Sequence, residues 1–418
     1  MNQVTYIPYM ADHAVVLAGA LRNHGISAQV LPPPDRVSLD LGLDMCKGRE
    51  CLPCFLCAGD IVRTCRRPDF KAEESRFLLP TSPGPCRFGQ YASLLRDILE
   101  QQGYGDVEIV SPTTENSYRG FGEHPAQLRF LAWQGFVTVD LMQKMLLQRR
   151  PYELVPGTAD AIYARGIERA ARDCEAGGGD ALVAAVRQTA REFASVAVDD
   201  RERRPRIGVV GEIYVLLNVY SNQGIARRIE SMGGEAIVAN LTEWIHFSVW
   251  CRKFLANVKG DRKDLFGAWV VDAYQRTAER RLRKAAAPGL RDDPEPTMNQ
   301  MMKSLDELYD PTLGTEATLS LGKALALAAE GASGILNVYP FSCMPGIIVS
   351  GMASAVRRRV DDLPWLDLSY DGQEDTNVGT RLEAFMHQVQ QYERRRHQRL
   401  APQPAPVTSY PGAEFLGF

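Results

Sequence analysis

The nine cysteines are the residues of this sequence with the clearest chemical potential, and their distribution is uneven. A thiolate is both a nucleophile and a ligand for zinc, iron and iron–sulfur clusters. In a reducing compartment, clustered cysteines therefore favour metal or redox sites over disulfides. Six cysteines lie in the first quarter of the chain: Cys46, Cys51, Cys54, Cys57, Cys65 and Cys86. The other three are isolated: Cys174, Cys251 and Cys343.

The start of the chain bears on the redox state of these thiols. The first residues, MNQVTYIPYMADHAVV, contain no basic segment followed by an apolar one. We therefore expect no signal peptide and a cytoplasmic protein. In that compartment the thiols stay reduced.

No local spacing in the segment CKGRECLPCFLC (46–57) completes a known metal motif. The segment contains two successive C-x2-C steps. A zinc ribbon needs a second such step about 15–20 residues further on, and Cys65 and Cys86 do not supply it. The bacterial ferredoxin pattern also fails, because its fourth cysteine and the proline after it are missing. A metal site in this chain must therefore recruit cysteines that are distant in sequence.

Composition excludes several classes of protein. The 418 residues correspond to roughly two to three domains. With 45% hydrophobic residues the chain can bury a large core, so it is not disordered. Its 48 basic residues are outnumbered by 51 acidic ones, and we expect no nucleic-acid partner. No stretch of about 18 apolar residues exists, and we expect no membrane span.

The pattern of residues 1–125 predicts an N-terminal α/β domain with a cysteine-rich loop. Strands that alternate with helices indicate a parallel sheet. Short apolar runs predict strands at 4–9, 26–31, 75–80 and 106–112, and helical spacing predicts helices at 13–25 and 87–103.

The rest of the chain divides into three parts. Residues 126–205 are helical in pattern and predict a helical bridge, and residues 401–418 are rich in proline and predict a flexible tail. Between them, residues 206–400 predict a second α/β domain. Its strands are expected at 206–215, 235–240, 334–340 and 365–372, and its helices at 221–234, 319–331, 347–360 and 380–400. The predicted fold class is therefore α/β, with two Rossmann-like parallel-sheet domains and a helical insertion.

Three cysteines share one structural context. Cys86 and Cys343 each follow a predicted strand and precede a predicted helix, and Cys51 lies in a loop marked by Gly and Pro before a helix-like run. Ligands of open parallel sheets bind at the loops after the strands, and a helix N-terminus stabilises a thiolate. Cysteines so far apart in sequence meet only if the two α/β domains face each other. The sequence therefore predicts a metal site in an interdomain cleft.

Other candidate residues carry weaker signals. Gly322-Lys323 resembles the end of a phosphate loop, but Ala324 replaces the required Ser or Thr, so we interpret it as a helix start. Glu212 ends a predicted strand, and either faces the cleft or caps a turn. The six histidines show no ligand spacing and are interpreted as surface or packing residues.

The remaining cysteines fall into two groups. Cys174 and Cys251 are interpreted as packing residues, as isolated cysteines usually are. The roles of four others stay open: Cys46, Cys54, Cys57 and Cys65.

Six longer strings carry a resemblance to a known family: GRECLPCFLCAGD, TSPGPCRFGQY, VVGEIYVLLNVYSNQ, LTEWIHF, PFSCMPG and LSYDGQEDTNVGTRLEAFMHQ. Together they resemble the 2-hydroxyacyl-CoA dehydratase superfamily. The most similar branch is that of the activase-related proteins with a region like the D-component of 2-hydroxyglutaryl-CoA dehydratase. The resemblance extends from about residue 4 to about residue 395.

The resemblance implies a cofactor, a reaction and partners. It implies Rossmann-like domains with an oxygen-sensitive [4Fe–4S] cluster between them, held by three cysteines that match Cys51, Cys86 and Cys343 here. A separate ATPase activator with its own iron–sulfur cluster would deliver a low-potential electron. The implied reaction is that of a lyase: an acyl-CoA thioester forms a ketyl radical and loses its hydroxyl. The implied assembly is a homo- or heterodimer.

The sequence also departs from this family. It contains no counterpart of the activator's ATPase domain, and it has additional cysteines at Cys46, Cys54 and Cys57. These three are secondary candidates for ligands of a larger cluster, because a related branch carries a double-cubane [8Fe–9S] cluster and reduces small molecules. We therefore expect an iron–sulfur lyase or an oxidoreductase, with a non-catalytic electron-relay subunit as the alternative. A structural zinc protein is disfavoured because the distant cysteines fit no zinc spacing.

Overall fold

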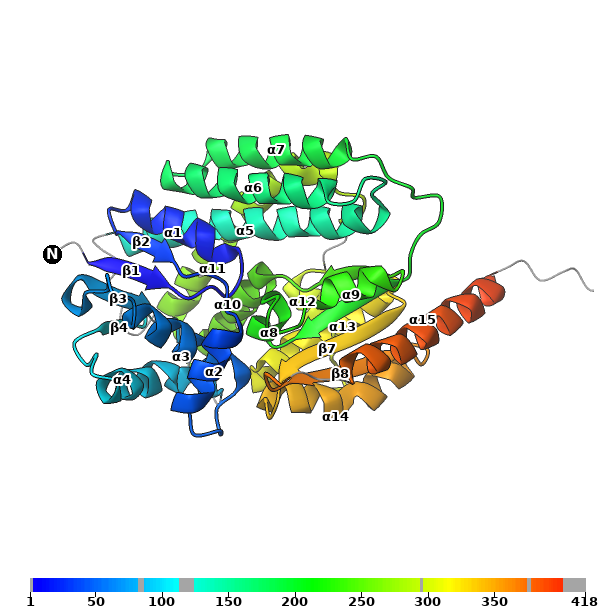
Figure 1. Cartoon of the computed structure of the whole chain (residues 1–418). Coiled ribbons are helices and arrows are strands. Elements are labelled where there is room, and N and C mark those ends of the chain that lie inside the picture. The colour runs from blue at the N-terminus through cyan, green and yellow to red at the C-terminus, as the bar shows by residue number, and fades with distance from the viewer. Residues whose placement is uncertain (1–2, 82–85, 113–123, 294–295, 374–376, 401–418) are drawn as a thin grey trace, which may run out of the picture.

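The computed structural model describes residues 3–81, 86–112, 124–293, 296–373 and 377–400. The expected tail at 401–418 and four residues of the TSPGPC segment (82–85) lie outside this part of the chain. The described chain contains two four-stranded parallel sheets and many helices, as Figure 1 shows. The predicted α/β class with two parallel sheets is therefore confirmed.

The first sheet has the strand order β2-β1-β3-β4, with all neighbours parallel. Its strands are β1 (Val4–Ile7), β2 (Ala28–Val30), β3 (Ser75–Leu78) and β4 (Glu108–Val110). The helices in this region are α1 (His13–Asn23), α2 (Arg36–Met45), α3 (Leu52–Cys65) and α4 (Tyr91–Gln101), with 3-10 turns η1 (Ala72–Glu74) and η2 (Arg87–Gln90).

The second sheet repeats this topology with the order β6-β5-β7-β8. Its strands are β5 (Arg206–Gly211), β6 (Glu235–Val238), β7 (Gly334–Pro340) and β8 (Trp365–Tyr370). Strand β7 is buried at six of its seven positions, as expected for a central strand of a sheet covered on both faces. In each sheet the chain order changes direction between the two central strands, and ligands of such sheets bind beside that point.

Eight further helices belong to the second half: α8 (Ile213–Leu217), α9 (Ile225–Ser231), α10 (Leu241–Val258), α11 (Arg262–Ala286), α12 (Met298–Ser304), α13 (Glu316–Ala329), α14 (Met344–Arg359) and α15 (Val378–Leu400). Two 3-10 turns, η4 (Ala287–Gly289) and η5 (Pro311–Leu313), lie among them. No helix in the described ranges has the length and apolarity needed to cross a membrane.

Residues between the two sheets form three stacked helices that run along one side of the molecule in Figure 1. They are α5 (Pro125–Arg149), α6 (Thr158–Glu175) and α7 (Asp180–Ala194), with the turn η3 (Arg150–Tyr152) after α5. Val16 of α1 and Leu282 of α11 are buried in the same apolar core as these helices. The helical layer therefore packs against elements from both halves of the chain.

The observed elements differ from the expected ones at three places. The strand expected at 206–215 ends at Gly211 because Glu212 begins helix α8. Helix α2 follows Asp35, which caps it, and was not predicted. Gly322-Lys323 lies in the middle of α13, so its interpretation as a helix start was wrong.

Helices α2 and α3 cross at close range because each places a glycine against the backbone of the other. A Cβ atom on Gly59 would lie 1.7 Å from the carbonyl oxygen of Ser38, and one on Gly42 would lie 1.9 Å from that of Phe55. Backbone atoms cannot yield as a flexible side chain can, so any larger residue must separate the helices. This crossing sets the position of α3 and of the cysteines on it.

We predict that Gly59→Ala lowers the free energy of unfolding by about 3 kcal/mol or more, because overpacking against backbone has no local relief. The matched control is Gly351→Ala in α14, where an added Cβ meets no atom within 4 Å. That change should raise stability by about 0.5–1 kcal/mol through helix propensity. Thermal unfolding followed by circular dichroism measures both, and an unchanged midpoint for Gly59→Ala would contradict the crossing.

Candidate functional site

Each of the three predicted ligand cysteines precedes the first residue of a helix. Cys51 is the N-cap of α3, Cys86 the N-cap of η2, which continues into α4, and Cys343 the N-cap of α14. None of the three side chains makes a capping hydrogen bond. Their sulfur atoms therefore remain available at positions where the helix dipole favours negative charge.

Arg87 joins the three loops that carry these cysteines. Its Nη2 donates to the carbonyl oxygen of Ser342 at 2.6 Å and to the Ser342 hydroxyl at 2.9 Å, and its Nη1 donates to the carbonyl oxygen of Arg49. Ser342 precedes Cys343 directly, and Arg49 lies two residues before Cys51. The side chain of the residue after Cys86 is thus hydrogen-bonded to one loop in each half of the protein.

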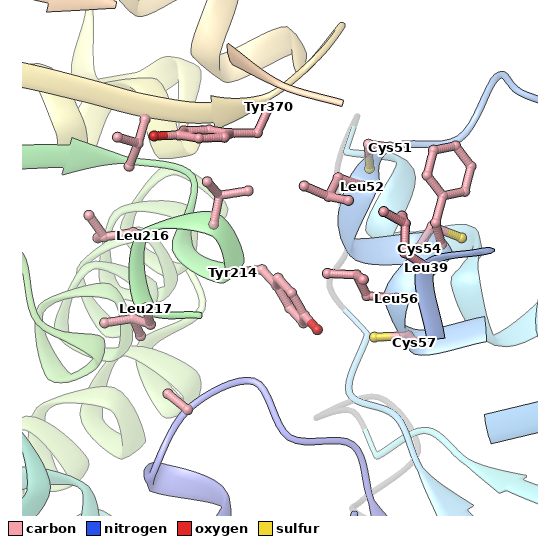
Figure 2. Close-up of a cluster of buried hydrophobic side chains, with 14 of the residues drawn as sticks. Leu39, Cys51, Leu52, Cys54, Leu56, Cys57, Tyr214, Leu216, Leu217 and Tyr370 are labelled. Atoms are coloured by element: carbon pink, nitrogen blue, oxygen red, sulfur yellow. The ribbon is translucent and has the colours of Figure 1, made fainter. Parts of the chain in front are cut away.

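The two halves also meet around this junction. The side-chain amide of Asn218, after α8, donates to the carbonyl oxygens of Tyr9 and Met10, which follow β1, at 3.3 and 3.0 Å. In Figure 2 the side chain of Tyr214, from the second half, points toward Leu56 of α3. These side chains belong to a single apolar core that spans both halves.

The environment of the three cysteines holds them as neutral thiols. Burial raises the pKa of Cys51 to about 11, although the hydroxyl of Tyr91, 2.6 Å from its sulfur, stabilises the thiolate. Burial likewise raises the pKa of Cys86 and of Cys343, while the backbone of Phe88 and of Gly346 opposes the increase. The charges of Cys86 and Cys343 each interact with that of Cys51. The three thiols are therefore electrostatic neighbours that would repel one another if all were ionised.

Glu212 lies among these thiols and also caps a helix. Its two carboxylate oxygens accept hydrogen bonds from the backbone N–H groups of Tyr214 at 3.0 Å and Val215 at 2.9 Å. Its negative charge raises the pKa of Cys51, of Cys86 and of Cys343. The two roles left open from the sequence, facing the cleft or capping a turn, are therefore filled by the same side chain.

A second carboxyl group, Glu316, completes the polar side of the site and was missed by sequence reasoning. Burial and the charge of Glu212 raise its pKa to about 8, although it accepts hydrogen bonds from the backbone of Ile213 and the side chain of Trp244. Glu316 also raises the pKa of Cys86 and Cys343. Burial raises the pKa of Glu212 too, so the two neighbouring carboxyl groups disfavour being ionised together.

The repeated topology relates Glu316 to Cys51. Helix α3 begins beside Cys51 and leads to β3, after which comes Cys86. Helix α13 begins at Glu316 and leads to β7, after which comes Cys343. Equivalent loops of the two sheets thus supply two cysteines in one half, and a carboxyl group and a cysteine in the other. Only the repeat of strand order would have pointed to Glu316 from the sequence.

The three secondary ligand candidates lie in or beside α3, but on different sides of that helix. Cys54 is hydrogen-bonded to Cys46 at the end of α2, and the charges of Cys51 and Cys57 act on it. In Figure 2 the Cys57 sulfur points toward the hydroxyl of Tyr214, whereas the Cys54 sulfur lies on the opposite side of the helix. Burial raises the pKa of Cys57, and Tyr214 opposes that increase. Cys46, Cys54 and Cys57 therefore adjoin Cys51 without pointing at a single centre.

Cys174 and Cys251, predicted as packing residues, and Cys65, whose role was left open, lie in apolar cores. Cys174 is fully buried in the helical core, Cys251 packs at the edge of the core around α12 and α13, and Cys65 is buried in the core under the first sheet. Two histidines face carboxylates, one buried and one partly buried. His13 Nε2 lies 2.8 Å from Asp140, which also accepts two hydrogen bonds from Thr242, and His246 Nε2 lies 2.9 Å from Glu279.

The donors at this site are thiols, which are ligands for soft metal centres. Within the described ranges, no three His, Cys, Asp or Glu side chains gather closely enough to hold a metal ion. All nine cysteines are free thiols. Three of them stand at helix starts whose loops Arg87 connects.

A scan of the chain against protein-family models gave no match, and a search of curated protein sequences gave none either.

We predict that Glu212→Gln makes the three thiols of the metal-free protein more reactive. Removing the negative charge lowers their pKa, and at pH 8, below the pKa of Cys51, a lower pKa means more thiolate. Labelling of Cys51, Cys86 and Cys343 by iodoacetamide should accelerate about three- to tenfold, since one pKa unit is a factor of ten. Peptide mass spectrometry measures each rate. The control, Glu100→Gln on the exposed side of α4, should label at the wild-type rate; equal rates in both variants would refute the proximity of Glu212.

Proposed function

We propose that this protein is an iron–sulfur component related to the 2-hydroxyacyl-CoA dehydratases. It would accept low-potential electrons from a separate ATP-hydrolysing activator and use them in reductive or radical dehydration of an acyl-CoA. The observation that carries the proposal is the convergence of Cys51, Cys86 and Cys343 at three helix starts joined by Arg87. A [4Fe–4S] cluster held by three cysteines would supply single-electron transfer and one iron open to an added ligand.

Some of the surrounding groups favour negative charge on the thiols, against the larger opposing effect of burial. Loading with iron requires the three thiols to lose their protons, and the positive guanidinium of Arg87 favours the charged form of Cys51 and Cys86. The backbone near Phe88 and Gly346 favours the thiolates of Cys86 and Cys343. Hydrogen bonds of this kind tune the potential of a cluster.

The carboxyl pair Glu212 and Glu316 gives the site a place to hold a proton. Removal of a hydroxyl group as water consumes a proton, and a buried carboxylic acid is a suitable donor. Burial and the charge of Glu212 both raise the pKa of Glu316, and burial raises the pKa of Glu212 as well, so the pair favours holding a proton. Two backbone N–H groups hold the Glu212 carboxylate in place and oppose the increase in its pKa.

The edge of the site suits a protein partner. Phe341, Met344 and Ile347, on both sides of Cys343, are exposed apolar side chains. An electron-donating activator must approach the cysteines closely, and an exposed apolar rim favours such docking. The nine free thiols suit the reducing cytoplasm. The homo- or heterodimer implied by the resemblance belongs to this proposal.

A larger cluster is the second candidate, and one observation favours it. Cys54 is hydrogen-bonded to Cys46, and the charges of Cys51 and Cys57 act on it, so all the additional thiols adjoin the first set. Six thiols in one region would suffice for a double-cubane [8Fe–9S] cluster in a reductase of small molecules. A non-catalytic electron relay would use the same ligands, without turnover of a substrate.

We predict that the protein, purified and reconstituted without oxygen, binds about four iron atoms per chain and is brown. Replacement of Cys51, Cys86 or Cys343 by Ala should remove most of the iron and the visible absorbance. The control, Cys174→Ala in the helical core, should retain both. Iron and sulfide analysis measures the metal content of each variant, and visible spectroscopy measures its absorbance. Full iron content in Cys343→Ala would disprove the site.

The additional cysteines separate the two cluster sizes. For the three-cysteine site we expect Cys46→Ala and Cys57→Ala to keep about four iron atoms per chain. A wild-type content of about eight, reduced in both variants, would instead support the double cubane. Turnover of a 2-hydroxyacyl-CoA with activator and ATP distinguishes a catalyst from an electron relay.

A further inference from the structure

Helix α13 carries a polar stripe along a face that is otherwise buried. Glu316, Ser320 and Lys323 follow one another at intervals of four and three residues, which places them on one side of the helix. Ser320 and Lys323 are only 6% and 5% exposed, in a helix whose other residues are mostly apolar. Glu330 ends the helix on the same side, two turns further on. Burying a polar side chain costs stability unless hydrogen bonds satisfy it. A row of buried polar side chains on one side of a mostly apolar helix is therefore unusual.

Two cavities run along the stripe and share part of their lining. The first, of about 20 Å³, is lined by Gly211, Asn240, Trp244, Glu316, Ser320 and Lys323, among others. The second, of about 40 Å³, is lined by Lys144, Arg206, Asn240, Asp292, Lys323 and Glu330, among others. Asn240 and Lys323 belong to both. A cavity above about 10–15 Å³ with polar partners holds a water molecule, so each of the two cavities has room for water.

Lys323, which lines both cavities, belongs to a buried ion pair. Lys323 Nζ donates to Oε1 of Glu243, and both residues are more than nine-tenths buried. The other carboxylate oxygen of Glu243 is also buried and has no hydrogen-bond partner in the protein. An unpaired buried carboxylate oxygen is costly unless water or a proton satisfies it.

The two cavities along α13 lie between the protein surface and the neighbourhood of the three cysteines. At the outer end, Lys144 pairs with Asp293 at 2.5 Å, Asp292 is exposed, and the charges of Lys144, Arg206 and Lys323 act on Glu330. At the inner end, Glu316 lines the first cavity and also acts on the charges of Cys86 and Cys343. Ser320, between the two ends, donates to the carbonyl oxygen of Gly211, the residue before Glu212.

We propose that the face of α13 formed by Glu330, Lys323 with Glu243, Ser320 and Glu316 conducts protons from the surface to the cysteine site. The proposal rests on the proposed function, because each electron supplied there by a low-potential donor needs a compensating proton. One proton leaves a hydronium ion or buffer acid at the Glu330 end and passes along water, Lys323–Glu243 and Ser320. On a carboxylate oxygen of Glu316 it replaces the proton that this group gives up when a hydroxyl group leaves as water. Only O–H and N–H bonds form and break on this route, and no residue is oxidised or reduced.

The first test measures proton uptake during reduction. The iron-loaded full chain is photoreduced with a flavin sensitiser in weakly buffered solution containing a pH indicator. Ser320→Val narrows the first cavity, and the double variant Lys323→Met, Glu243→Leu removes the ion pair without leaving one charge unpaired. Both should slow proton uptake tenfold or more, with unchanged iron content and unchanged final proton number. The matched control, Lys303→Met on the exposed side of α12, should behave as the wild type.

A second test does not need a cluster. The carboxylic acid band of Glu316, assigned by its loss in Glu316→Gln, is followed by infrared spectroscopy after mixing the metal-free protein at pH 6 into D2O. The path predicts exchange at least tenfold slower in both path variants than in the wild type and Lys303→Met. Wild-type exchange rates in the two path variants, with wild-type melting temperatures, would overturn the path. A chain without iron counts against the proposed function alone, and this second measurement still decides the path.

Discussion

The guanidinium of Arg87 makes the contact on which the arrangement of the site depends. It donates to carbonyl oxygens beside Cys51 and Cys343 while standing next to Cys86 itself. A guanidinium remains charged and offers five donors in a rigid plane, so one side chain can hold two loops from different halves of the protein. Its positive charge also favours the thiolate forms of Cys51 and Cys86, against the effect of burial and of Glu212. The same residue therefore meets a geometric need and an electrostatic one.

Close backbone approach brings the helix starts to that contact. Gly59 and Gly42 let α3 lie against α2, and Gly346 lets the first turn of α14 lie against Tyr339, whose ring atom would be only 2.4 Å from an added Cβ. Gly211, at φ 143°, gives the chain the conformation that brings Glu212 to the start of α8. Each of these positions lies near a residue of the site. The backbone is thus most constrained where the chemistry is placed.

The two halves share a strand order but contribute different chemistry. In the first half the paired loops supply thiols, and in the second they supply one thiol and the carboxyl group of Glu316. This asymmetry gives the site one side made of sulfur and one side made of oxygen acids. The oxygen side continues along α13 into Ser320, Lys323 and Glu330, whereas the sulfur side continues into the apolar core around α3. Electrons and protons would therefore reach the site from different directions.

The sequence by itself determined the parallel α/β halves and the helical segment between them, and it predicted Cys51, Cys86 and Cys343 as candidate ligands, because local periodicity and strand–cysteine–helix order are encoded by neighbouring residues. It did not reveal Glu316, the burial of Lys323 against Glu243, or the pairing of Cys46 with Cys54. These depend on contacts between segments distant in the chain, which leave no local pattern. Gly322-Lys323 was misread for the same reason: only the packing of α13 shows that its lysine is buried in mid-helix. The tertiary structure alone decided which charges face the thiols, because burial and distance set their strength.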